Sequence, residues 1–176
     1  MRMWVKVGGR YGEQAEFHAG GMGSGLGSVM LTGIAVSAAD PSGLWGTLKE
    51  AFASSSALNA AKLSASSNEL IKSTVADFET SQGRSDVQKA LRERFADAQP
   101  NECVDRALAG LTRVSTILDA KAPGDSAAFK AWLCSISQKV AEASVEGAFL
   151  GFGGQRVSAA EKATLADIAK GLETTA

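Results

Sequence analysis

The sequence predicts an all-α fold of about seven helices packed as a bundle. Apolar residues recur at steps of three and four through almost all of the chain after residue 27. Proline and glycine separate these periodic segments, and only "MWVKV" at residues 3–7 alternates like a short strand. The 176 residues are 45% hydrophobic and 21% charged, which suits one globular domain with a real core. We expect a glycine-rich N-terminal segment over residues 1–27, flexible or strand-like, and a single helical domain over residues 28–176.

Two helices are expected in the first third of the chain. The first covers the apolar run of residues 28–39, and the second begins at Asp40-Pro41. Aspartate suits the N-cap and proline the first helical position. The second helix extends to about Lys62, is followed by a loop through Ser67, and buries one face made of Leu44, Trp45, Leu48, Phe52 and Leu58.

Two further helices are expected between residues 68 and 98. The period resumes at Asn68 and Gly83 breaks it. "SDVQ", from Ser85 to Gln88, fits a capping box that starts the next helix. The apolar positions of the two helices are Leu70, Ile71, Val75 and Phe78, then Val87, Leu91 and Phe95.

Three helices complete the predicted bundle. One follows Pro100, the next is capped by Asp125 after the Pro123-Gly124 turn and runs to about Glu146, and "SAAE" from Ser158 opens the last. Their apolar faces are Val104, Leu108, Leu111, Val114 and Leu118; Phe129, Trp132, Leu133, Ile136 and Val140; and Leu165, Ile168 and Leu172.

Two segments of the sequence look alike. "LTGIAVSAADPSGLWGTLKEAF" and "LTRVSTILDAKAPGDSAAFKAWLCSI" both read as apolar helix, proline-centred turn and aromatic-led helix. They allow two repeated helical hairpin units of about eighty residues. Any two amphipathic helices joined by a proline turn also give this pattern, so both interpretations stay open.

The run from Ala19 to Ala39 carries no charge and has a length that suits a bilayer. Spacings such as Gly21-x-x-x-Gly25 favour close helix contact in lipid. However, its first half is glycine and serine, and the run has no basic or aromatic anchors at its two ends. We expect a buried helix from about Ser28, with membrane activity through residues 19–39 as the alternative.

Charge, cysteine content and the N-terminus indicate a cytoplasmic protein. The formal net charge of −1 disfavours a general nucleic-acid binder. Cys103 and Cys134 fall in apolar helical stretches, which favours reduced core thiols over a disulfide. The first residues lack the apolar core of a signal peptide.

No arrangement of residues in the sequence favours catalysis. His18 is the only histidine, and no "G-x-S-x-G" motif is present. Glu93 and Asp97 lie four apart on one helix and are candidates for a hard cation, although solvated carboxylates explain them as well. The neighbouring basic residues Lys89, Arg92 and Arg94 are interleaved with acids and have no stacking platform for nucleic acid.

The glycine-rich stretch "GAFLGFGGQRVSAAE" precedes the last expected helix. It lacks the spacing of a phosphate-binding loop and follows a helix, so a structural corner is the simpler interpretation. The alternative is a small-anion site at the N-terminus of that helix, made of Gly153, Gly154, Arg156 and Ser158.

The C-terminal pattern F-K-x-W-L, G-x-F-L-G-F-G-G and V-S-x-x-E resembles a group of uncharacterised bacterial all-helical proteins. More distantly, the chain resembles the tellurite-resistance TerB-like helical proteins. The resemblance implies an all-helical fold with repeated hairpins and a cytoplasmic, stress-related role, and it implies no catalytic residues. TerB-like proteins carry an acidic metal-binding turn. The matching turn here, "ADPSG", keeps Asp40 but lacks the acidic residues after it.

Together these observations predict a non-catalytic cytoplasmic helical module that acts through a protein partner or as a homodimer, without a cofactor. A TerB-like domain that binds a ligand or a cation is the first alternative. Its metal candidates are Asp40, Glu93 and Asp97.

Overall fold

The computed structural model describes residues 25–39, 68–146 and 157–174. These ranges contain six helices and no strand, so the expected all-α class is confirmed for them. The helices are α2 (Gly25–Ala39), α5 (Glu69–Glu79), α6 (Ser81–Phe95), α7 (Pro100–Lys121), α8 (Pro123–Glu146) and α9 (Ala159–Gly171). Each corresponds to one of the seven expected helices. Three of the sequence predictions fall at least partly outside the described residues. They are the helix over 41–62, the strand at 3–7 and residues 40–52 of the first proposed repeat segment.

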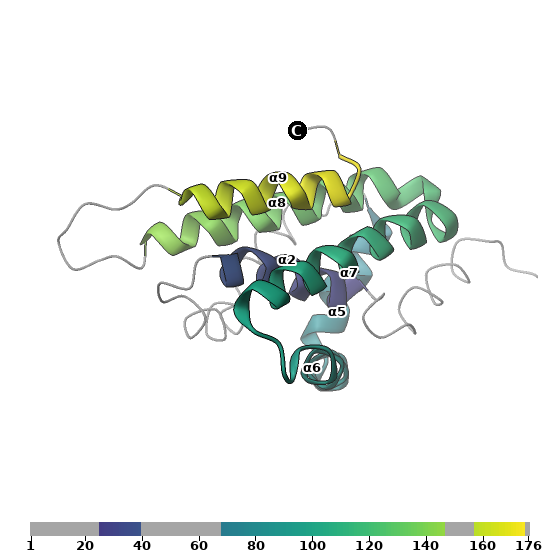
Figure 1. Cartoon of the computed structure of the whole chain (residues 1–176). Helices are drawn as coiled ribbons and strands as arrows, with labels where there is room; N and C mark the ends of the chain where they lie inside the picture. The colour runs from purple at the N-terminus through teal and green to yellow at the C-terminus, as the bar shows by residue number, and fades with distance from the viewer. Residues whose placement is uncertain (1–24, 40–67, 147–156, 175–176) are drawn as a thin grey trace, which may run out of the picture.

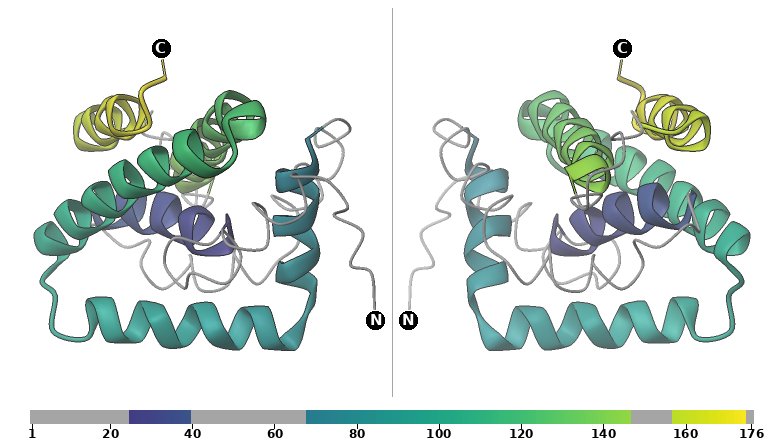
Figure 2. Two further views of the ribbon diagram at one scale, coloured as in Figure 1. Left: turned by 90° about the vertical axis from the view of Figure 1, so that its right-hand side faces the viewer. Right: turned by 90° about the vertical axis from the view of Figure 1, so that its left-hand side faces the viewer.

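The six helices are arranged around α2. Helices α8 and α9 run side by side in opposite directions (Figure 1). Helices α5, α6 and α7 follow one another as three sides of a frame (Figure 2). Helix α2 lies within this arrangement and contacts all five of the other helices, α7 most extensively.

Helix α2 occupies the centre because its sequence offers no polar face. It has no acidic or basic residue in its first or last turn, and twelve of its fifteen residues are buried. A helix that is apolar all round is stable only when every side is covered. The expected buried helix in this part of the chain is therefore confirmed.

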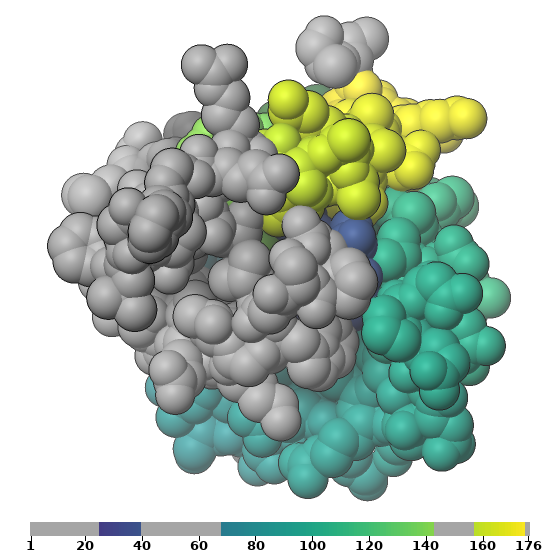
Figure 3. Space-filling view, turned by 60° about the vertical axis from the view of Figure 1, so that its left-hand side comes forward, coloured from purple at the N-terminus to yellow at the C-terminus, as the bar shows by residue number. Residues whose placement is uncertain are grey.

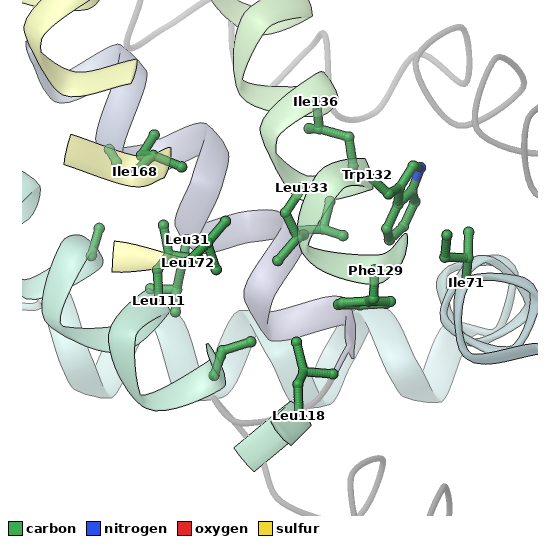
Figure 4. Close-up of a cluster of buried hydrophobic side chains, with 14 of the residues drawn as sticks. Leu31, Ile71, Leu111, Leu118, Phe129, Trp132, Leu133, Ile136, Ile168 and Leu172 are labelled. Atoms are coloured by element: carbon green, nitrogen blue, oxygen red, sulfur yellow. The ribbon is translucent and has the colours of Figure 1, made fainter. Parts of the chain in front are cut away.

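The core forms where α2 meets its neighbours. Leu31 of α2, Leu111 of α7 and Leu172 after α9 are fully buried and lie together in Figure 4. On α8, the rings of Phe129 and Trp132 pack edge to face with their centroids 5.3 Å apart. Most predicted core positions are buried, whereas Phe78, Leu91, Phe95, Val104, Leu108, Val140 and Leu165 are half-buried.

Two helices begin before their predicted starts. Helix α2 begins at Gly25, three residues before the expected Ser28. Helix α8 begins at Pro123, so Asp125 lies in its first turn and is not the cap that we expected. Proline at the first helical position needs no N–H partner, and this favours the earlier start of α8.

The predicted break between the third and fourth helices was also wrong. Helix α5 ends before Thr80, and the Thr80 hydroxyl caps α6 by accepting from the backbone N–H of Gly83 at 2.9 Å. Gly83 therefore lies inside α6, and the expected capping box at Ser85 does not start the helix. A Cβ at Gly83 would overlap the backbone carbonyl of Asp77, which explains the glycine at this sharp corner.

The crossing of α2 and α5 gives a direct test of this packing. A Cβ at Gly25 would overlap the hydroxyl of Thr74, which is 1% exposed. Gly25→Ala is expected to lower the free energy of unfolding by about 1–3 kcal/mol because the crowded side chains must move apart. Gly124→Ala is the control, since a Cβ there meets nothing within 4 Å. It should leave stability unchanged or raise it by up to about 1 kcal/mol. Equal effects of the two substitutions in urea titrations would contradict the close crossing.

Candidate functional site

The expected anion site at the start of α9 is described only at Ser158. Gly153, Gly154 and Arg156 lie outside the described residues. The Ser158 hydroxyl accepts from the backbone N–H of Glu161 at 3.1 Å, and the Glu161 carboxylate accepts from the backbone N–H of Ser158 at 2.8 Å. This is the capping box that the sequence predicts. The Glu161 carboxylate already supplies negative charge at this helix start.

The cation candidates do not gather into a site in the described ranges. The side chains of Glu93 and Asp97 are exposed at the C-terminal end of α6, and Asp40 lies outside the described residues. No group of three or more histidine, cysteine, aspartate or glutamate side chains among the described residues is placed to hold a metal ion.

The two cysteines are free thiols on different helices. Cys103 of α7 is buried, and this burial raises the pKa of its thiol above the ordinary value. Cys134 of α8 is half-buried, and its Sγ lies 3.2 Å from the hydroxyl of Thr174. A buried thiol with a raised pKa is a poor nucleophile, because the thiolate is the reactive form.

A polar group joins the α7–α8 hairpin at a position that the sequence did not reveal. Lys130 is 6% exposed, and its Nζ donates to Asp119 Oδ2 at 2.7 Å. The hydroxyl of Ser126 donates to the other oxygen of Asp119 at 2.5 Å, and the carboxylate of Glu173 lies 3.8 Å from Lys130 Nζ. These contacts compensate the buried ammonium charge and tie the end of α9 to the hairpin.

Three arginines of α6 and α7 influence one another electrostatically. We call Arg94 of α6 and Arg106 and Arg113 of α7 the arginine cluster. Arg94 Nη2 donates to the backbone carbonyl of Arg106 at 2.7 Å, and Arg106 Nη1 donates to the backbone carbonyl of Arg94 at 2.9 Å. This reciprocal pair fixes the end of α6 to the second turn of α7.

Two features favour the arginine cluster at this position: the small size of Gly110 and the unpaired carbonyls at the C-terminal end of α6. A Cβ at Gly110 would lie 2.7 Å from Leu31 Cδ1 and 3.3 Å from Arg94 Nη2, so the glycine leaves room for both side chains against α7. The Arg94 carbonyl lies in the last turn of α6, where backbone carbonyls lack partners within the helix and cations are favoured. The other end of α6 uses the same chemistry, because Arg84 donates to the carbonyls of Phe78 and Glu79 at 2.8 and 2.9 Å.

The arginine cluster keeps an excess of positive charge. Burial, together with the charges of Arg113 and Arg106, lowers the pKa of Arg94 below its ordinary value. The Nε of Arg94 is buried without a hydrogen-bond partner. Arg106 has a carboxylate near it, Glu102 at 3.6 Å, and Arg113 has no hydrogen bond or ion pair with any described residue. The cluster is therefore suited to a negatively charged group from outside.

Sequence reasoning singled out Arg94 but missed Arg106 and Arg113. The only available signal was their spacing of seven residues, which places them on one side of α7 with Gly110 between them. The contact with Arg94 depends on how α6 and α7 cross.

No protein-family model, curated protein or solved structure matches the chain.

In the described part of the chain, the polar group on the hairpin predicts a pH-dependent stability. Hydrogen bonds from Lys130 and Ser126 lower the pKa of Asp119. The ionised carboxylate therefore contributes stability above the unfolded-state pKa of about 3.9, and this contribution is lost as the pH falls through the lower folded-state pKa. Asp119→Asn should lower Tm at pH 7, and the two Tm values should converge in acid. Asp167→Asn, at an exposed position on α9, is the control. A Tm difference for Asp119→Asn that stays constant between neutral and acidic pH would contradict this role.

Proposed function

We propose that this protein is a non-catalytic helical module that acts through protein contacts and associates with a second copy of itself. The proposal is carried by one observation, which is that Arg113 and the two carboxylates Glu93 and Asp97, on the α6–α7 edge of the described structure, have no ion-pair partner among the described residues. The arginine cluster supplies the cations. Glu93 and Asp97 supply exposed carboxylates that have no hydrogen bond or ion pair with another described residue.

A dimer with twofold symmetry would bring the positive and negative charges of this surface together. In an interface with twofold symmetry, a residue of one copy meets a different residue of the other copy, and the same contact occurs twice. The arginine cluster of each copy would then face Glu93 and Asp97 of the other copy. These residues lie on α6, on α7 and in the turn between them, and the Arg94–Arg106 hydrogen bonds hold the end of α6 against α7.

Such an association is expected to be weak and sensitive to salt. Exposed ion pairs contribute about 0–1 kcal/mol each, and ions screen charges beyond about 8 Å at physiological ionic strength. The formal net charge of −1 supports a local contact, since the chain as a whole has no strong field that attracts a partner.

Two features support a binding role over catalysis. Burial raises the pKa of the Cys103 thiol, which disfavours the reactive thiolate, and Cys134 lies beside a threonine hydroxyl. Lys130 is buried, and its Nζ donates a hydrogen bond to Asp119. This lysine is therefore not available as a general base. From the TerB-like resemblance we also propose a cytoplasmic, stress-related setting. The metal-binding form of that proposal has no supporting contact in the described residues.

The dimer proposal predicts a specific effect of Arg113. Arg113→Gln removes an exposed charge that has no hydrogen-bond partner among the described residues, so it should preserve the fold and weaken the dimer severalfold. Lys170→Gln, on the exposed side of α9, removes the same charge elsewhere and should leave the dimer unchanged. Sedimentation velocity at low and at high salt measures both. A wild-type chain that is monomeric at every concentration in low salt would overturn self-association. Equal effects of the two variants would overturn the placement of the interface.

A further inference from the structure

The polar side chains of α2 donate their hydrogen bonds to backbone carbonyls of the same helix. The helix contains no charged residue, and its buried polar side chains are Ser28, Thr32 and Ser37. The Ser28 hydroxyl donates to the Gly25 carbonyl at 2.6 Å, the Thr32 hydroxyl to the Ser28 carbonyl at 2.8 Å, and the Ser37 hydroxyl to the Gly33 carbonyl at 2.7 Å. All three hydrogen bonds stay within α2.

This pattern of hydrogen bonds has a consequence for where α2 can be stable. Moving a helix out of a protein core into lipid is costly when it breaks hydrogen bonds to neighbouring elements. For α2, none of these three hydroxyls would lose its acceptor on such a transfer. A helix that is apolar on every side is typical of a protein core or of a membrane.

The bundle conceals α2 from solvent. Five helices contact it, and Figure 3 shows a part of it between α9 and α7. Leu31 and Val36, two of its large apolar side chains, are 0% and 1% exposed. Since α2 is covered by separate helices, it becomes available only when these move apart.

We propose that α2 has a second stable environment, the hydrocarbon core of a lipid bilayer, which it enters when the surrounding helices separate. The fifteen residues of α2 span about 22 Å as a helix, against a hydrocarbon core of about 30 Å. Within the described ranges no helix is both long and apolar enough to cross a membrane. The proposal is therefore insertion of α2 into the bilayer from one side. The sequence before α2 is uncharged back to Ala19.

The close crossing of α2 and α5 provides a reversible way to prevent this movement. A Cβ at Gly25 would lie 3.0 Å from the Cβ of Thr74, so a shift of less than about 1 Å would allow a disulfide between cysteines at the two positions. Helix α5 carries the charged residues Glu69, Lys72, Asp77 and Glu79, which oppose its entry into lipid. A disulfide between the two helices should keep α2 in the bundle.

The experiment compares one protein in two redox states. The chain carries Gly25→Cys and Thr74→Cys, with Cys103→Ala and Cys134→Ala so that only one disulfide can form. It is added to dye-loaded vesicles of equal parts phosphatidylcholine and phosphatidylglycerol. The reduced protein should float with the vesicles and release the dye, and oxidation should abolish nearly all of the release. Dye release that is equal in both states, or the absence of flotation and release in the reduced state, would overturn the proposal.

A second measurement uses the unaltered chain in case the double-cysteine protein does not fold. Wild-type protein is incubated with the same vesicles, digested with protease, and the fragments that remain with the lipid are identified by mass spectrometry. A protected fragment that contains residues 25–39 and lacks α7 and α8 supports insertion of α2. Fragments retained with the lipid that lack residues 25–39, or no retained fragment, would overturn it.

Discussion

The structure depends on the burial of one helix from all sides. Helix α2 has no polar face, so it imposes a constraint on every helix that contacts it: each must present apolar residues towards α2 and keep its charges on the other side. Helices α7, α8 and α9 meet this requirement with fully buried Leu111, Leu133 and Ile168. The close approach of α5 additionally requires Gly25 opposite Thr74. Apolar burial is therefore the main source of the bundle's stability, and the glycine sets how near the helices come.

The charged contacts act at the periphery and fix how the helices connect. Helix α6 has a single buried residue, Val87, and its ends are held by arginines that bind backbone carbonyls. Lys130 joins the α7–α8 hairpin to the end of α9 through Asp119 and Glu173. In both places a long cationic side chain satisfies groups that a helix terminus or a buried position would otherwise leave unpaired. The arginine cluster carries more positive charge than this structural task needs, and this excess is the basis of the proposed interface.

The sequence predicted what depends on local spacing and missed what depends on contacts between helices. The capping box of Ser158 and Glu161 lies within four residues and was predicted in full. At the start of α6, Thr80 and Ser85 were both able to cap, and the sharp corner at Gly83 selects Thr80. The contacts of Arg94 with Arg106 and of Cys134 with Thr174 join residues 12 and 40 positions apart. These contacts depend on how the helices cross, and the spacing of apolar residues in the sequence does not specify the crossing.

Native-state hydrogen exchange of the α2 amides tests most directly whether this helix organises the fold. If α2 is the element on which the bundle depends, its amides will exchange only through global unfolding. Their opening free energy will equal the largest values in α7 and α8 and match that from urea titration. Amides of α2 that exchange through a smaller, local opening while α7 and α8 remain protected would contradict this account. They would show that the outer helices form a stable structure without it.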